Sequence, residues 1–392
     1  MTSYVRSESP HPFDQLTIET LRQRRSVKWR RYDPDVLPCW VAEMDYPLAD
    51  PIRAVLSELV ERHDTGYADF DGLADAFAEF SARRLGVRVD PESVYPVPDV
   101  MVGIHVSLEL FTAPADGVVV CPPVYPPFYS TIPYAGRRVV EAPLAYDSAS
   151  SRYDLDLDAI ERALRTGARA LLLCNPHNPV GRAWSRADLE AVAELAERHD
   201  AVVLSDEVHG PLTYDDSRFT AFGSLDTPAV RRSVTLTSAS KAFNLPGLKC
   251  AVVVAGSPEM RKVFDVLPDE VPLGTSIFGV AANIAAFRDG DAWLDSTTGY
   301  LQHNRDLLGA LIAERLPTVR WSPPAATFLG WLDFAGAQLG NEPADAILER
   351  ARVALYPGER FGTGGGGFAR LNFATTSAVL TQAVDRMAAA LT

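Results

Sequence analysis

Lys241 is the residue around which this sequence can build chemistry. It follows the apolar stretch Ser233–Thr237, and Ser238 and Ser240 stand just before it. A lysine beside a buried strand is costly to desolvate, and a desolvated amine loses its proton readily and can attack a carbonyl carbon to form a Schiff base. The two serines, with Lys249 further on, could bind an anionic phosphate. The alternative is an exposed lysine after an ordinary strand.

Two further polar groups follow neighbouring apolar stretches. Asn178 comes shortly after Ala168–Cys174, and Asp206 comes directly after the stretch 201–205. Ligands of parallel α/β sheets bind beyond the carboxyl ends of the strands, so we expect Asn178, Asp206 and Lys241 to lie close together. Taken singly, each motif has a plainer interpretation: a Pro/Asn turn for the first, and a helix cap or surface acid for the second.

Three other places carry candidate binding groups. Tyr125 lies in a proline-rich loop and could cover an aromatic ligand, or it could be part of a hydrophobic plug. Asp99 is a good helix cap, so the free N–H groups of Val100 and Met101 could bind phosphate. Arg370 stands in a predicted strand, where a guanidinium could hold a carboxylate or form a structural ion pair.

Apolar stretches alternate with helical segments through the middle of the chain, which predicts an α/β fold. The expected strands are 118–121, 138–141, 168–174, 201–205, 233–237 and 250–255. Strands that are apolar on both faces indicate a mainly parallel sheet sandwiched by helices, and this sheet forms the large domain. From about residue 290, long helices and short strands predict a smaller α+β domain. We expect an arm at 1–48 that belongs to the small domain, a large domain at 49–289 and the small domain at 290–392.

Composition excludes several classes of function. The 392 residues carry 37 basic and 51 acidic side chains, a net charge of −14 with no long basic run, which argues against nucleic-acid or membrane partners. The N-terminus lacks the apolar core of a signal peptide, and no apolar stretch reaches membrane-spanning length. The four scattered cysteines and seven histidines have no metal-ligand spacing, so we expect no metal and a cytoplasmic location. The G-x-G-x-x-G match at 362–367 is rejected as a dinucleotide site, because no helix follows it.

The motifs together resemble the fold-type I enzymes that use pyridoxal 5′-phosphate (PLP), in the class I/II aminotransferase superfamily. They are Asn-Pro-x-Asn-Pro-x-Gly at 175–181, Ser-Asp-Glu-x-His at 205–209, Ser-x-Ser-Lys at 238–241 and Arg-Leu-Asn at 370–372. A finer pattern is similar to the cystathionine β-lyase, or carbon–sulfur lyase, branch of MalY/PatB type. It comprises Lys28-Trp29, Trp-Val-Ala-Glu-Met-Asp-Tyr-Pro at 40–47, Gly66-Tyr67, Ser-Lys-Ala-Phe-Asn-Leu-Pro-Gly-Leu at 240–248, Phe-Leu-Gly-Trp-Leu-Asp at 328–333 and Gly-Phe-Ala-Arg-Leu-Asn-Phe at 367–373.

This resemblance implies a role for each candidate around the cofactor ring. Lys241 would carry PLP and move the substrate proton. Asp206 would pair with the pyridine nitrogen, Asn178 would bind the phenolic oxygen and Tyr125 would stack on the ring. His209 stands where many aminotransferases have a tyrosine, which agrees with the lyase branch, and it would also contact the cofactor.

Other implied contacts involve the phosphate, the substrate and a second subunit. Val100, Met101, Ser238 and Ser240 would hold the phosphate. Lys249 replaces a phosphate-binding arginine of aminotransferases, and a lysine there cannot form the bidentate fork. Tyr67 would reach the phosphate of the neighbouring subunit, so the active unit would be a homodimer with its sites at the interface. Arg370, Asp45 and Tyr46 would bind a small amino-acid substrate.

The resemblance leads to a lyase that cleaves cysteine-S-conjugates to a thiol, pyruvate and ammonia. An aminotransferase acting on a small amino acid is the alternative, because both reactions share the catalytic residues Lys241, Asp206 and Tyr67. A PLP-binding protein with a regulatory role is the second alternative. The branch-level pattern favours the lyase.

Overall fold

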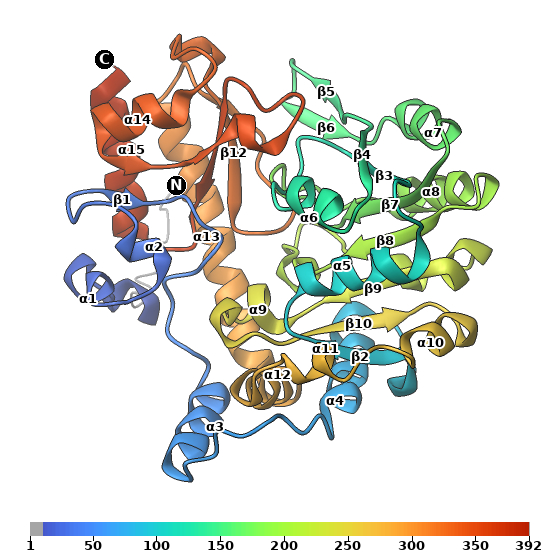
Figure 1. Cartoon of the computed structure of the whole chain (residues 1–392). Coiled ribbons are helices and arrows are strands. Elements are labelled where there is room, and N and C mark those ends of the chain that lie inside the picture. The colour runs from blue at the N-terminus through green and yellow to red at the C-terminus, as the bar shows by residue number, and fades with distance from the viewer. Residues whose placement is uncertain (1–10, 392) are drawn as a thin grey trace, which may run out of the picture.

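The computed structural model describes residues 11–391, and its centre is a seven-stranded sheet in the order β2-β10-β9-β8-β7-β3-β4 (Figure 1). Its strands are β2 Val94–Val97, β3 Gly117–Val120, β4 Arg138–Glu141, β7 Ala168–Cys174, β8 Val202–Asp206, β9 Ser233–Thr237 and β10 Ala251–Ala255. Five neighbouring strands of this sheet pair in parallel, namely β4, β3, β7, β8 and β9. β10 runs antiparallel to both of its neighbours, β9 and β2. The predicted α/β fold with a mainly parallel sheet is confirmed, and β2 is the strand that the sequence pattern did not predict.

Helices cover both faces of this sheet, as its two-sided apolar strands require. On one face, α5 (Val100–Phe111) buries Ile104 and Leu108 against Val118 of β3 and Leu204 of β8. On the other face, α7 (Leu157–Arg165) and α8 (Arg186–Arg198) pack on alternate residues of the same strands. Both faces of the sheet are thus buried under helices, and a site can form at the ends of its strands.

The helix cap predicted at Asp99 is present. Asp99 accepts a hydrogen bond of 2.9 Å from the Val102 N–H, and Ser185 and Asp188 form a capping box at the start of α8. Between residues 11 and 48 the arm contains two short α-helices, which are too brief to show a helical period in the sequence. The remaining helices are α1 Ile18–Arg22, α2 Val27–Arg30, α3 Asp50–Glu61, α4 Leu73–Phe80, α6 Phe128–Tyr134, α9 Ala239–Ala242, α10 Pro258–Phe264, α11 Glu270–Leu273, α12 Ile277–Asp289, α13 Asp291–Arg315, α14 Pro343–Ala351 and α15 Ser377–Leu391.

A second, four-stranded antiparallel sheet forms near the C-terminus, in the order β11-β12-β15-β14. Its strands are β11 Arg320–Trp321, β12 Leu329–Asp333, β14 Tyr356–Pro357 and β15 Phe368–Asn372. The arm joins this region, because β1 (Leu37–Pro38) pairs in parallel with β13 (Val353–Ala354). The smaller α+β unit is therefore confirmed. A separate hairpin of β5 (Ala145–Asp147) and β6 (Arg152–Asp154) extends from the large unit.

The segment after β1 connects the arm to both parts of the molecule. The Asn372 side-chain amide donates to the carbonyl oxygens of Val41 and Glu43 at 2.6 and 2.7 Å. On the other side, Asn244 accepts a hydrogen bond of 2.8 Å from the Met44 N–H. The domain boundaries at residues 48 and 289 stay a prediction. Between residues 11 and 391, no helix combines the length and the apolarity that crossing a membrane requires.

Candidate functional site

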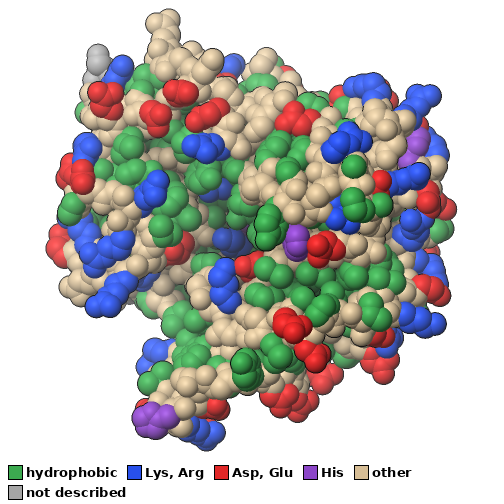
Figure 2. All heavy atoms as spheres, in the orientation of Figure 1, with side chains coloured by type: hydrophobic (Ala, Val, Ile, Leu, Met, Phe, Trp, Pro, Cys, Tyr) green, Lys and Arg blue, Asp and Glu red, His purple; other side chains and the backbone are tan. Residues whose placement is uncertain are grey.

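A cavity of about 200 Å³ lies at the carboxyl ends of β7, β8 and β9 and brings together ten of the predicted residues. They are Val100, Met101, Tyr125, Asn178, Asp206, His209, Ser238, Ser240, Lys241 and Lys249. The space-filling view in Figure 2 shows the molecular surface hollowed near its centre, with basic side chains in the hollow. Arg370, Asp45, Tyr46 and Tyr67 are not among the cavity-lining residues.

Lys241 lies on α9, whose N-cap is Ser238. Its Nζ donates a hydrogen bond of 3.0 Å to the carbonyl oxygen of Ala42 in the arm. Burial, reinforced by the positive charge of Arg370, lowers the pKa of Lys241 to about 8, while Asp206 works in the opposite direction. A substantial fraction of this amine is therefore neutral at slightly alkaline pH and can act as a nucleophile or base.

Asp206 ends β8 and is buried, with 5% of its surface exposed. The Val208 N–H donates to its Oδ1 at 3.3 Å, and no other hydrogen bond to this carboxylate occurs among the residues described. Burial raises the pKa of Asp206 to about 6, and Lys241 partly offsets that rise. A carboxylate with so few donors is suited to pair with a protonated nitrogen of a bound group.

His209 and Tyr125 are neutral groups at the same cavity. Burial, with the nearby charge of Lys241, lowers the pKa of His209 well below its usual range. Its Nδ1 is buried and has no hydrogen-bond partner within the described chain, and its ring meets Phe328 edge-on. Burial raises the pKa of Tyr125 to about 12, so its hydroxyl stays protonated. The loop that carries Tyr125 is fixed by a hydrogen bond of 2.9 Å from the Val124 N–H to the Phe361 carbonyl.

Hydrogen-bond donors line the cavity where α5 and α9 begin. Val100 and Met101 begin α5, and Ser240 carries a hydroxyl that has no hydrogen bond within residues 11–391. The hydroxyl of Ser238, in contrast, donates to the Cys250 carbonyl at 2.6 Å and caps α9. A helix N-terminus with adjacent hydroxyl groups is an anion-binding arrangement, so this part of the cavity suits a phosphate.

Lys249 contributes to this part of the cavity less directly than the sequence pattern suggests. Its Nζ forms an ion pair of 2.7 Å with Asp99 Oδ2, at the N-cap of α5. More than half of the Lys249 side chain is exposed. Its charge is therefore shared with Asp99, and it lies near the donors of the cavity without the rigid placement that a buried arginine would have.

Arg370, on β15, is buried, with 2% of its surface exposed. Its Nη1 donates to Asn178 Oδ1 at 2.9 Å, its Nη2 donates to the Trp40 carbonyl at 3.1 Å, and its Nε has no partner in the described structure. Burial lowers the pKa of Arg370 to about 10, and the described residues place no carboxylate in ion-pair contact with it. A buried guanidinium without an acidic partner is suited to bind an anionic ligand group.

The structure does not bring the other three predicted residues to the cavity. Asp45 forms a buried ion pair of 2.8 Å with Lys28 and accepts a hydrogen bond of 2.7 Å from Trp29. Tyr46 stacks on Phe13 with ring centroids 4.4 Å apart, inside the core. Tyr67, between α3 and α4, is 83% exposed. Asp45 and Tyr46 thus help to fix the arm, and Tyr67 is free to contact another molecule.

Sequence reasoning missed two residues that position Lys241. Ala42 supplies the carbonyl oxygen that accepts from the lysine, and Asn244 donates a hydrogen bond of 2.8 Å to the Met44 carbonyl. Both residues belong to the runs already quoted at 40–47 and 240–248, but backbone acceptors carry no signal in a residue pattern. Over residues 11–391, no group of three or more His, Cys, Asp or Glu side chains is placed to hold a metal ion.

The chain is similar to known proteins over nearly its whole length. Residues 32–387 match the family model described as aminotransferase class I and II. A candidate cystathionine β-lyase of Mycobacterium leprae is 43% identical, covering 97% of this chain and 98% of its own. The cystathionine β-lyase of Corynebacterium glutamicum is 37% identical over 95% of this chain and 99% of its own. The crystal structure of a candidate PLP-dependent β-cystathionase from Corynebacterium diphtheriae superposes with a TM-score of 0.91 at 37% identity, covering 96% of this chain and 98% of its own.

Proposed function

Because the chain belongs to the class I and II aminotransferase family, in its cystathionine β-lyase branch, we propose that it is a PLP-dependent carbon–sulfur β-lyase. Its substrates are cysteine-S-conjugates such as cystathionine, and its products are a thiol, pyruvate and ammonia. One observation carries the proposal: a single cavity holds an amine of lowered pKa at Lys241, a buried acid at Asp206 and unpaired donors for a phosphate.

The residues of the cavity fit PLP in three ways. The Asp206 carboxylate accepts a single hydrogen bond from the residues that the structure describes, and it can pair with a protonated ring nitrogen. The N–H groups of Val100 and Met101 and the hydroxyl of Ser240 match a phosphate. Tyr125 supplies an aromatic ring at the wall. When bound, PLP supplies an electron sink for the negative charge that develops at the substrate Cα.

The chain's own groups would then divide the work of the reaction. Lys241 attaches the cofactor and moves the proton at the substrate Cα, which its pKa of about 8 allows near neutral pH. Asp206 keeps a negative charge beside the ring nitrogen. Arg370, with its Nε unpaired, binds the substrate carboxylate and thereby orients the Cα–H bond.

Feeding the enzyme cystathionine without any keto acid tests this function. We expect pyruvate to accumulate, measured by coupling to lactate dehydrogenase, and we expect Lys241→Ala to abolish it. Lys262→Ala, which removes an exposed charge on α10 away from the cavity, is the matched control and should keep full activity. Absence of pyruvate from a protein that contains its cofactor would refute the lyase.

An aminotransferase is the second candidate, because the family model itself is that of class I and II aminotransferases. The same residues would serve, with a keto acid as the second substrate. Incubation with cystathionine and 2-oxoglutarate separates the two: a transaminase forms glutamate in proportion to the substrate consumed, and the lyase forms pyruvate whether or not the keto acid is present.

We further propose that the active unit is a homodimer in which Tyr67 reaches the neighbouring subunit's cofactor phosphate. Its 83% exposure and its position outside the cavity of its own chain support a contact with another subunit. We also propose a cytoplasmic location, because the four cysteines are buried free thiols, as a reducing compartment favours.

A further inference from the structure

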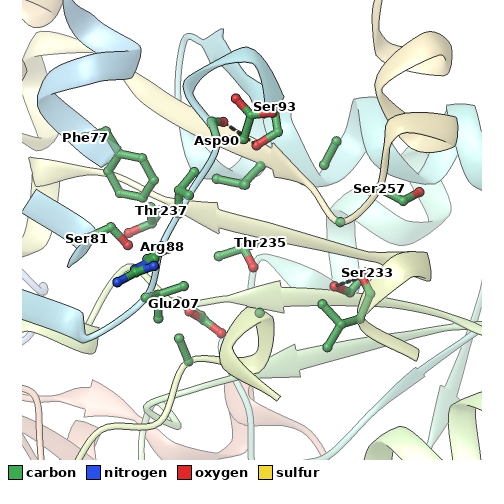
Figure 3. A pocket seen from close by; sticks show the side chains of 18 of the residues that line it. Phe77, Ser81, Arg88, Asp90, Ser93, Glu207, Ser233, Thr235, Thr237 and Ser257 are labelled. Atoms are coloured by element: carbon green, nitrogen blue, oxygen red, sulfur yellow. Dashed lines mark hydrogen bonds between the residues drawn. The ribbon is translucent and has the colours of Figure 1, made fainter. Parts of the chain in front are cut away.

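A second cavity, of about 240 Å³, lies on the face of β9 that carries Thr235 and Thr237 (Figure 3). Its walls come from α4, from the segment 81–93, from β9 and from the start of α10. It shares no lining residue with the proposed PLP cavity. Consecutive residues nevertheless line the two cavities, because Asp206 lines the proposed PLP cavity and Glu207 lines the second one. The structure therefore has a second cavity, separate from the one proposed to bind PLP.

Several hydroxyl groups line this cavity without a partner. β9 alternates Ser-Val-Thr-Leu-Thr, so Val234 and Leu236 join the apolar core of the opposite face while the hydroxyl side chains face the cavity. The hydroxyls of Thr237 and Ser81 make no hydrogen bond within the described part of the chain, although these residues are only 4% and 2% exposed. These hydroxyl groups are thus available to hydrogen-bond a molecule in the cavity.

Glu207 supplies a buried acid to the same space. One of its oxygens, Oε1, accepts hydrogen bonds from the Ser205 hydroxyl at 2.8 Å and from the Phe222 N–H at 2.7 Å. The other oxygen has no hydrogen bond among residues 11–391, and Glu207 is only 3% exposed. Burial raises the pKa of Glu207 to about 7, and a bound cation would offset that cost of ionisation.

A basic group at the cavity is also without a partner. Arg88 is exposed and makes no ion pair or hydrogen bond within the described residues. The other charged groups of the lining are already paired, because Arg261 forms ion pairs with Asp90 at 3.1 Å and with Glu92 at 2.5 Å. Considering the described residues, the cavity therefore presents an acid and a base without ionic partners and a set of hydroxyl groups, among walls that are otherwise mostly apolar. Figure 3 shows Glu207, Arg88 and Thr237 around the same space.

From this lining we infer that the second cavity binds a small α-amino acid with a polar side chain. The ammonium group binds Glu207, the carboxylate binds Arg88, and the side chain meets the hydroxyl groups of Thr235 and Thr237. A zwitterion is the class of small molecule that satisfies both unpaired charges without a net charge of its own. Glu207 lies on the same face as Ser205, whose hydroxyl donates to it, and therefore on the opposite face from the Asp206 side chain. A molecule bound there is linked to the proposed PLP site through the backbone that joins Asp206 to Glu207, and this position suits an effector.

Calorimetric titration of the holoenzyme with α-methyl-L-serine tests the inference. This probe has an ammonium, a carboxylate and a hydroxyl group, and it lacks the α-hydrogen that the proposed lyase would remove. We expect Glu207→Gln and Arg88→Ala each to weaken binding about tenfold or more, the size of a lost charge-assisted hydrogen bond. The probe can also enter the proposed active site, where its carboxylate would bind Arg370, so the wild type should show two components of binding. Arg370→Lys should weaken the active-site component and leave intact the component that depends on Glu207 and Arg88. Lys262→Ala, which removes a charge outside the lining, should change neither component.

Each other outcome counts against the second site. If all of the binding is lost in Arg370→Lys and kept in Glu207→Gln, the probe occupies the proposed active site alone and the inference is refuted. Equal weakening by Arg88→Ala and Lys262→Ala would reduce the effect to general electrostatics, and no binding to the wild type would refute the inference outright. Thr237→Val, which is nearly isosteric, provides an independent variant if Glu207→Gln does not fold, and it too should weaken binding. Because binding is measured without turnover, the result does not depend on the lyase assay.

Discussion

The guanidinium of Arg370 donates a hydrogen bond of 2.9 Å to the side-chain oxygen of Asn178. This contact joins β15 of the small sheet to the loop after β7 of the large one. Since the oxygen of Asn178 accepts from Arg370, its NH₂ group is the part left to donate to a bound group. The residue proposed for the substrate carboxylate and the residue proposed for the cofactor's phenolic oxygen are therefore positioned by each other.

Arg370→Lys should raise KM for cystathionine about 10- to 100-fold, because a lysine cannot keep both of the arginine's contacts and a carboxylate partner. Steady-state kinetics measures the change, and the absorbance of bound PLP should persist. The matched control is Arg320→Lys, at the half-exposed guanidinium that pairs with Asp333. An unchanged KM would remove Arg370 from the substrate site.

The stability of the cofactor-free protein should depend on pH through Lys241. Its pKa is about 8 in the folded protein against 10.5 in the reference state, so between these values the unfolded chain binds more protons. The free energy of unfolding therefore gains up to about 1.4 kcal/mol per pH unit above pH 8 from this group. Urea titrations of the wild type and Lys241→Met should diverge with that sign between pH 8 and 10. Parallel curves would mean that the amine is not desolvated.

Asp45→Ala should cost about 3–5 kcal/mol of unfolding free energy, because it leaves the buried ammonium of Lys28 unpaired. The exposed pair of Asp50 and Arg53 is the control, and Asp50→Ala should cost at most about 1 kcal/mol. Denaturant unfolding measures both. If Asp45→Ala instead left stability intact and raised KM, Asp45 would be a substrate ligand, as the family resemblance implied.

Mixing two inactive variants tests whether Tyr67 acts across a dimer. In a heterodimer of Lys241→Ala and Tyr67→Ala subunits, one of the two sites combines an intact Lys241 with the partner's intact Tyr67. Refolding an equimolar mixture should thus restore about a quarter of wild-type activity, because half of the dimers are mixed and each has one native site. Activity that stays at the sum of the separate variants would show that Tyr67 serves its own subunit or none.

The sequence was sufficient for the sheet and for most of the cavity, because parallel strands place their carboxyl ends at one edge. That rule alone brought Asn178, Asp206 and Lys241 together, and all three line the cavity. β2 was missed because it is a short edge strand that contains Pro96 and pairs with a strand far along the chain. In such a strand the apolar pattern is weak, and the pairing decides the structure.

Asp45 shows where residue patterns stop being informative. It stands in the same run as Ala42, whose carbonyl touches Lys241, yet its own side chain turns to Lys28 and Trp29. Which side of an irregular segment faces a cavity depends on tertiary partners. The second cavity had a visible signal in the alternation of Ser233–Thr237, but a strand with alternating polarity also fits an ordinary solvent-facing position.

The hydrogen bonds from Asn372 to the Val41 and Glu43 carbonyls tie the beginning of the polypeptide to its end. During translation, the segment 41–43, which contacts Lys241, therefore cannot reach its final position until β15 has left the ribosome. A premature stop codon ahead of residue 372 would yield a chain that retains the whole large sheet and the reactive lysine. That chain would lack Asn372, which holds the segment 41–43 beside the lysine.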